Sequence, residues 1–265
     1  MNKLWQAFLQ MTRPSSVIEY MRENNILPFE LERLINVSQD VEHHPEGDAY
    51  IHTLMVVDSA AKIASREDLS YTDNLVLLFA ALTHDLGKAT NTQITEDGKI
   101  TSYGHAEAGV EPAINMLTAI GLPSEYIHEI TPLVREHMAH IGYYMPEVTT
   151  RQVRRLMQRL RPSNIQMLAY VVEADMSGRG GKYYEQGLPD KFKRILQMAV
   201  DIDISEQNEV APIITGDDLQ ALGFTAGPIL GQVKQLVYEA QLRNEFTDKH
   251  TGYQWVVSHI IGGAF

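Results

Sequence analysis

The 265-residue chain contains no cysteine, which excludes disulfide bonds and thiolate metal sites. A metal ion would have to be held by imidazole, carboxylate, backbone oxygen or water, and this donor set suits Mn, Fe, Co, Ni, Zn or Mg. The chain has no apolar run near the roughly 18 residues that a membrane span requires. Its N-terminal segment also lacks a long apolar stretch and a small-residue cleavage site. We therefore expect a cytoplasmic protein with no membrane partner.

Basic residues are fewer than acidic ones, because the chain has 22 Lys and Arg and 34 Asp and Glu. Its net charge is therefore −12. This balance excludes adhesion to nucleic acid through the whole surface. One segment differs, because residues 151–161 contain no acid and carry Arg151, Arg154, Arg155, Arg159 and Arg161. This face either binds a phosphate backbone or nucleotide, with Arg154 and Arg155 as candidates, or is solvated and pairs with acids of neighbouring helices.

Strand signals are also scarce, and the pattern predicts an all-α protein. One short hairpin is expected at 94–101, ITEDGKIT, with its turn at Asp97 and Gly98. Helical periodicity predicts helices near 15–24, 28–37, 49–65, 73–86, 105–120, 124–140, 150–160, 163–177, 189–202, 216–222 and 228–243.

Residues 204–215 lack a helical period and contain a proline, so we interpret them as a linker. The predicted organisation is an N-terminal helical segment at 1–40, a central domain at 41–203 and a C-terminal helical unit at 204–265.

An ionisable pair follows the most apolar helical segment. Residues 74–87 read NLVLLFAALTHDLG, and the residues from Leu75 to Leu82 are apolar on every face, so this helix must be buried. His84 and Asp85 stand at its end. A buried pair of this kind must be hydrogen-bonded, ion-paired or metal-bound, because an isolated buried carboxylate is too costly.

Other apolar helices each add one candidate ligand. His52 lies within YIHTLMVV, Asp175 ends an apolar helix before a glycine, His105 opens a helix, and His137 lies late in LVREHMAH. Each residue alone is more often a hydrogen-bonded structural residue. Together with the His-Asp pair they supply six nitrogen and oxygen ligands, which suits two metal ions bridged by a carboxylate.

Several side chains beyond these ligands are candidates for substrate contacts. Lys88, one turn after the His-Asp pair, either donates to a phosphate oxygen or interacts with a helix C-terminus. The others are Arg179 and Lys182 in the glycine-rich loop after the last ligand, and His140 one turn after His137. His43 and His44, ahead of His52, are expected to line the mouth of the pocket.

The six candidate ligands form the pattern H…HD…H…H…D, which resembles that of the HD-domain metal-dependent phosphohydrolases. The stretches EHHPEGDAYIHTLMVVDSAA, FAALTHDLGKAT, GHAEAGV and EADMSGRGG resemble the HD domain of bacterial CCA-adding tRNA nucleotidyltransferases. Residues 216–246 resemble the C-terminal helical unit of those enzymes, and the whole resemblance covers roughly residues 25–246. The one D-x-D motif, at Asp201 and Asp203, has no Gly-rich turn before it, so we expect nucleotide addition to be absent.

The resemblance implies an HD-domain helical bundle with a small C-terminal helical unit. It implies two divalent ions, of Mn, Ni, Fe, Co or Mg, and His84, Asp85 and Lys88 as catalytic residues. The first ion would be held by His52, His84, Asp85 and Asp175, and the second by His105 and His137 with Asp85 bridging.

The activities implied are those of a phosphatase and a 2′,3′-cyclic phosphodiesterase acting on nucleotides or RNA ends, with tRNA as a candidate partner. Two alternatives stay open: a nucleotidase for free (d)NTPs or signalling nucleotides, and a catalytically silent RNA-binding protein.

Overall fold

The computed structural model describes residues 1–139, 148–180, 187–207, 212–243 and 245–262. The chain divides into two compact units, Met1–Ile202 and Asp203–Phe265, and each has a hydrophobic core of its own. Within the described ranges the elements are helices apart from one two-stranded sheet, which confirms the predicted all-α fold class.

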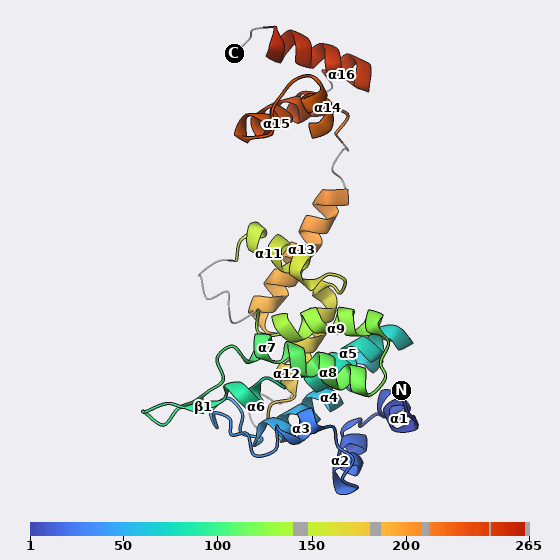
Figure 1. The fold of residues 1–265 in the computed structure, drawn as a ribbon, viewed down its shortest axis with the longest axis vertical. Helices are drawn as coiled ribbons and strands as arrows, with labels where there is room; N and C mark the ends of the chain where they lie inside the picture. The colour runs from blue at the N-terminus through green and yellow to red at the C-terminus, as the bar shows by residue number, and fades with distance from the viewer. Residues whose placement is uncertain (140–147, 181–186, 208–211, 244, 263–265) are drawn as a thin grey trace. The chain divides into compact units, whose positions relative to one another are not determined.

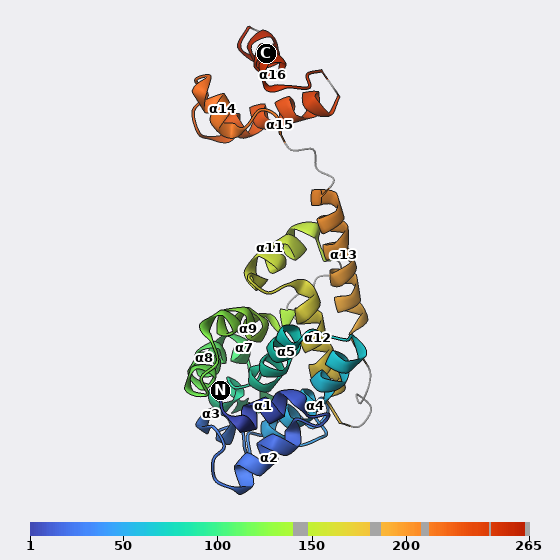
Figure 2. The same ribbon diagram turned by 90° about the vertical axis from the view of Figure 1, so that its right-hand side faces the viewer.

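Four helices form the centre of the first unit (Figures 1 and 2). They are α4 (Ala49–Arg66), α5 (Tyr71–Thr83), α9 (Ser124–Glu136) and α12 (Ile165–Ser177). Helix α5 packs against the other three. Every residue from Leu75 to Thr83 is buried, as the apolar run predicts.

Side-chain caps begin three of these helices at fixed positions. Asp48 accepts from the backbone of Ile51 ahead of α4, Ser70 caps α5, and Asn164 caps α12. Each cap satisfies an amide that the first helical turn leaves without a backbone acceptor. The caps therefore determine where the ligand-bearing helices start.

The remaining elements of the first unit surround this centre. They are α1 (Lys3–Gln10), α2 (Ser15–Glu23), α3 (Phe29–Glu32), α6 (Lys88–Asn91), β1 (Gln93–Ile94), β2 (Ile100–Thr101), α7 (His105–Ala108), α8 (Val110–Ala119), α11 (Thr150–Leu160) and the part of α13 (Asp190–Gln207) up to Ile202. Residues 1–40 share the core of this unit, because Trp5 and Phe8 of α1 pack their rings against Phe79.

The predicted hairpin is confirmed. Strands β1 and β2 pair antiparallel, with Gln93 opposite Thr101 and Ile94 opposite Ile100. Gly98 in the turn has φ +81°, which side chains other than glycine rarely adopt. The hairpin leads into His105, which begins α7.

The structure differs from the predicted elements in several places. The helix predicted over 28–37 is limited to α3, the one predicted over 105–120 breaks at Gly109 into α7 and α8, and helix α13 continues to Gln207 into the predicted linker. Three short helices were not predicted, α1, α6 and α16 (Lys249–Val256). Helix α16 contains Gly252, a weak helix former, but packing against Ile214 and Phe246 overrides this propensity.

The second unit contains α14 (Gly216–Ala221), α15 (Pro228–Leu242), α16 and a π-helical turn at Val257–Ile261. Its core is built from Leu219, Val233, Val237 and Val256 among others. Asp218 joins α14 to α16, because it lies 2.8 Å from the Lys249 ammonium and accepts from the Tyr253 hydroxyl at 2.8 Å. No helix in the described ranges is both long and apolar enough to cross a membrane.

Gly87 brings the turn after α5 into backbone contact with α7. A Cβ at this position would meet the carbonyl oxygen of His105 and lie 2.6 Å from the amide nitrogen of Gly109. We expect Gly87→Ala to lower the free energy of unfolding by about 1–3 kcal/mol, because the overlap requires the backbone to move. Chemical denaturation measures this.

Gly231→Ala, within α15, is the control, since no atom lies within 4 Å of the added Cβ. It is expected to be neutral or stabilising by up to about 1 kcal/mol. Equal stability of Gly87→Ala and the native chain would contradict the close approach.

Candidate metal centre

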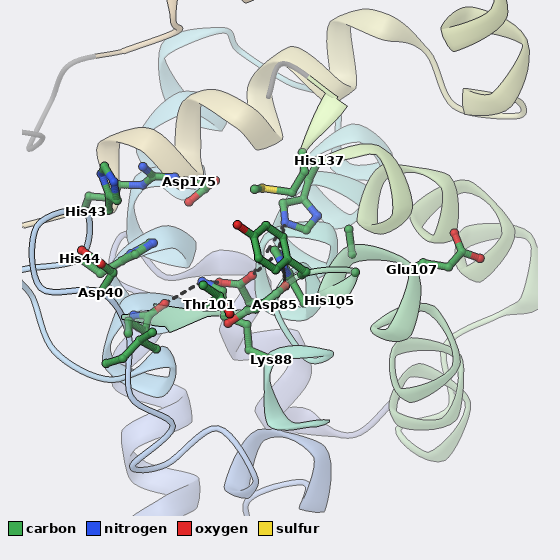
Figure 3. Close-up of a pocket in the computed structure, with 18 of the residues that line it drawn as sticks. Asp40, His43, His44, Asp85, Lys88, Thr101, His105, Glu107, His137 and Asp175 are labelled. Atoms are coloured by element: carbon green, nitrogen blue, oxygen red, sulfur yellow. Dashed lines mark hydrogen bonds and ion pairs between the residues drawn. The ribbon is translucent and has the colours of Figure 1, made fainter. Parts of the chain in front are cut away.

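The six predicted ligands lie together inside the first unit. The termini of several helices lie beside one another here, and each places a polar side chain in the same interior space. The contributors are His52 on α4, His84 and Asp85 after α5, His105 at the start of α7, His137 at the end of α9, and Asp175 near the end of α12. All six are buried. Figure 3 shows His105, His137 and Asp175 approaching Asp85 from separate segments.

Asp85 lies at the centre of the group. Its Oδ1 is 3.2 Å from Nε2 of His105 and 3.8 Å from Nε2 of His137. Its Oδ2 is 3.1 Å from Nε2 of His84 and 3.6 Å from Nε2 of His52. Asp85 is therefore shared by two groups that are each compact enough to hold an ion, one with His52 and His84 and one with His105 and His137.

Asp175 adds a second carboxylate on the His52 side. Its Oδ1 lies 3.1 Å from Nε2 of His52, and its Oδ2 lies 3.5 Å from the guanidinium of Arg179. Asp175 is not part of the compact group of His52, His84 and Asp85, but it borders that group through His52.

Backbone carbonyls orient three of the imidazole rings. The Nδ1 atoms of His84, His105 and His137 lie 2.8, 2.7 and 2.6 Å from the carbonyl oxygens three residues earlier. A proton on Nδ1 leaves the lone pair on Nε2, which is the arrangement of most metal-ligating histidines. The Nε2 atoms of His105 and His137 are 3.1 Å apart, so two lone pairs face each other unless a proton or cation lies between them.

Two buried atoms support a cation at this centre. Within the part of the chain that the structure describes, neither Nε2 of His84 nor Oδ2 of Asp85 makes an aligned hydrogen bond, although both atoms are buried. With Nδ1 of His84 bonded to a carbonyl oxygen, its Nε2 lone pair faces Oδ2 of Asp85 at 3.1 Å, and Oδ2 is also ion-paired with the Lys88 ammonium at 2.7 Å. The imidazole and carboxylate donors fit a divalent transition metal, which would satisfy both atoms.

The electrostatics put Asp85 and His137 in the state that metal binding needs. Burial opposes the charge on Asp85, but His84 and Lys88 outweigh it and hold the carboxyl pKa well below its usual range. Burial, together with the neighbouring His105 and His84, lowers the pKa of His137 to about 3. Asp85 is therefore ionised and His137 neutral near pH 7, as metal ligands must be. Burial opposes a charge on His84, but Asp85 outweighs it and raises the His84 pKa, so a metal ion there competes with a proton.

A cavity of about 800 Å³ opens onto this centre. Cations line it on several sides, from Lys88 and Arg179 beside the two carboxylates to Lys99 and Arg135 farther out. The cavity is large enough for a nucleotide-sized ligand. Its four cations are matched by four carboxylates in the lining, Asp40, Asp85, Glu107 and Asp175, so its cationic side chains are available to a phosphate only beside acids.

Lys88 lies beside the central carboxylate, and its contact with a phosphate stays a prediction. It begins α6, and its ammonium lies 2.7 Å from Oδ2 of Asp85 and donates to Gln39 at 2.6 Å. It is therefore an ion-pair partner of the central carboxylate, inside the cavity lining.

The structure gathers only some of the predicted substrate residues. Arg179, His43 and His44 line the cavity with Lys88. Arg154 and Arg155 lie on α11 and do not line it. On the same helix Arg159 pairs bidentately with Glu136, through bonds of 2.7 and 2.9 Å. His140 and Lys182 lie outside the described residues.

Sequence reasoning missed several residues of this site. Gln39 and Arg135 line the cavity, and Tyr103, which is 84% exposed, lies two residues before His105. Glu46 lies behind His52, with its Oε1 2.8 Å from Nδ1 of that ring. The one available signal was the position of Glu46 between His44 and His52 in EHHPEGDAYIH.

Comparison with known proteins identifies the central part of the chain. Residues 49–173 match the HD domain family. The chain is 32% identical over 244 residues to a multifunctional CCA protein from Xanthomonas oryzae, covering 87% of this chain and 53% of that protein. A multifunctional CCA protein from Stenotrophomonas maltophilia is 33% identical over 214 residues, covering 76% and 49%. One from Haemophilus influenzae is 30% identical over 189 residues, covering 69% and 43%.

These matches confirm the resemblance on which the sequence analysis relied. The chain spans about half the length of the curated relatives it matches. The HD match covers the helices that supply His52, Asp85 and His105, and it ends two residues before Asp175. Residues 49–173 therefore form an HD domain, within a chain that is similar to part of the multifunctional CCA proteins.

Proposed function

We propose that this protein is a metal-dependent phosphohydrolase that acts on a phosphomonoester or a 2′,3′-cyclic phosphodiester of a nucleotide or RNA end. The observation that carries the proposal is the sharing of Asp85 by two histidine groups at a cavity whose lining includes Lys88 and Arg179. Two adjacent cation positions with a common carboxylate suit displacement at phosphorus.

The ligands divide between two positions. His52, His84, Asp85 and Asp175 would hold one divalent ion, and Asp85, His105 and His137 a second. Such ions lower the pKa of water and neutralise charge on phosphate oxygens. The chain's own residues orient the ligands and supply the cationic groups Lys88 and Arg179, which would bind the phosphate from the cavity side.

The cavity and the relatives support the proposed substrate class. An HD domain in a chain similar to multifunctional CCA proteins favours a nucleotide or RNA-end substrate over an unrelated phosphate ester. Such substrates agree with the cytoplasmic location that we propose. The His/Asp centre supports hydrolysis, and we expect no nucleotide addition from it.

Metal binding itself is testable without catalysis. Excess Mn²⁺ or Ni²⁺ is expected to raise the melting temperature, since an ion at 100 times its Kd stabilises the folded state by about 2.7 kcal/mol per site. Asp85→Asn removes the anionic ligand common to both histidine groups and should abolish most of the metal-induced rise in melting temperature. Differential scanning calorimetry with and without metal measures it.

Asp97→Asn makes the same chemical change in the exposed hairpin and should keep the full increment. An increment that survives in Asp85→Asn would show that the ion binds elsewhere.

Hydrolysis is tested on 2′,3′-cyclic AMP, p-nitrophenyl phosphate and dNTPs with added Mn²⁺ or Ni²⁺. We expect turnover of the first two, and a loss of kcat/KM of about 100-fold or more in Asp85→Asn, while Asp97→Asn behaves as the native chain. Turnover of dNTPs alone would favour a free-nucleotide nucleotidase. Metal binding without any turnover would favour an RNA-binding protein and contradict the proposal.

Binding of tRNA would engage the arginine face of α11. We expect the Arg154→Glu/Arg155→Glu double variant to weaken tRNA binding about tenfold or more at low salt, because two cations become two anions. Filter binding over a salt series measures both the affinity and its salt dependence.

The control is Lys3→Glu/Arg33→Glu, which makes the same charge change at exposed positions on other segments. Equal tRNA affinity of the α11 variant and this control would indicate that the arginine face of α11 is a solvated surface that does not bind tRNA.

A further inference from the structure

Glu46 is a buried carboxylate that the proposed mechanism does not yet use. It belongs to the segment that precedes α4, yet its side chain is only 2% exposed. Burying an ionised carboxylate is costly unless hydrogen bonds or charges offset the lost hydration. Its partners therefore show why the chain keeps an acid at this position.

Three partners from three segments meet this carboxylate. Its Oε1 lies 2.9 Å from Nδ1 of His44 and 2.8 Å from Nδ1 of His52, and its Oε2 accepts the amide of Gly180 at 2.9 Å. The rings of His44 and His52 meet edge to face, with centroids 4.7 Å apart. A Cβ at Gly180 would lie 3.1–3.3 Å from Glu46, so a residue without a side chain allows this approach.

The contact with His52 lies behind the metal-facing side of that ring. Nε2 of His52 faces Asp175 at 3.1 Å and Asp85 at 3.6 Å, while Nδ1 faces Glu46. The three other candidate ligand histidines have neutral carbonyl oxygens at Nδ1. Nδ1 of His52 is close to this carboxylate but is not aligned with it as a hydrogen bond. The carboxylate charge beside Nδ1 favours a proton on that nitrogen and leaves the lone pair on Nε2, and it makes the imidazole a stronger donor than a carbonyl does.

The contact with Gly180 reaches a second part of the site. Gly180 follows Arg179, whose guanidinium lies 3.5 Å from Oδ2 of Asp175 and lines the cavity. The same carboxylate therefore fixes the backbone next to a cavity arginine. His44, on its other side, lines the cavity from the segment before α4 (Figure 3).

We propose that Glu46 is a positioning residue that sets the metal affinity of the centre by orienting His52 and by tying the Arg179 segment to the loop before α4. This inference rests on the metal centre of the proposed function. His44, Glu46 and His52 are also close enough to hold an ion themselves. We favour positioning, because Oε2 already accepts from Gly180 and a third ion would require both ring nitrogens of His52 to bind metal.

The test is the metal affinity of the full chain carrying Glu46→Gln. Isothermal titration with Mn²⁺ or Ni²⁺ is expected to show binding weakened about 10- to 100-fold with the number of bound ions unchanged. Glu42→Gln is the matched control, since it makes the same change at an exposed position of the same segment and should bind metal as the native chain does. Circular dichroism without metal checks that both variants fold.

A second variant keeps the Glu46 carboxylate and disturbs only the backbone beside it. Gly180→Ala places a methyl group 3.1–3.3 Å from Glu46 and should weaken metal binding by less than Glu46→Gln does. If Glu46→Gln does not fold, Gly180→Ala tests the positioning role of Glu46 by itself. A metal affinity equal to that of the native chain would then contradict that role.

Three results overturn the inference. Native affinity in a folded Glu46→Gln variant would show that the carboxylate does not act on the metal centre. Loss of one bound ion with unchanged affinity for the rest would make Glu46 a ligand of a third ion. If the native chain binds no metal, this result contradicts the proposed function, and it contradicts the positioning role as well.

Discussion

The structure depends on the burial of one carboxylate, that of Asp85, at the junction of several apolar helices. Four imidazole nitrogens and the Lys88 ammonium lie within 4 Å of its two oxygens. Such a charge would destabilise the fold if it were alone, because burial removes its hydration. The surrounding groups therefore serve folding and chemistry together, and the same array that makes the carboxylate tolerable is a set of metal ligands.

Helix ends produce this convergence. Helix α5 is buried on all sides, so its first polar side chains after the apolar run, His84 and Asp85, emerge in the interior instead of in solvent. Helix α9 likewise ends at His137, and its chain turns there as well. Because carbonyls in the last turn of a helix have no helical partner, they accept from Nδ1 of the histidine that follows and aim its Nε2 inward. The hydrogen bonding of the helix terminus thus selects the ligating nitrogen.

Much of the site was readable from local pattern. The apolar run at Leu75–Leu82 predicted a buried helix, and the histidines and aspartates at the ends of similar helices predicted a cluster, because ionisable groups in such places need partners. The hairpin followed from the turn chemistry of Asp97 and Gly98. Glu46 was not predicted, since its position between His44 and His52 is a weak signal for an acid in a polar segment. Its partner Gly180 is 134 residues away, and only the fold makes them neighbours.

The sequence by itself determined the fold class, the donor chemistry and the identity of the candidate ligands, because these depend on residue type and helical spacing. The tertiary structure decided which ligands share an ion, since that depends on ångström-scale distances between helices far apart in the chain. It also decided that Lys88 pairs with Asp85 and that Arg154 and Arg155 lie away from the cavity, which their positions along the chain do not reveal. Sequence spacing determines which side chains share a face of one helix, whereas the distance between side chains on two helices is set by tertiary packing.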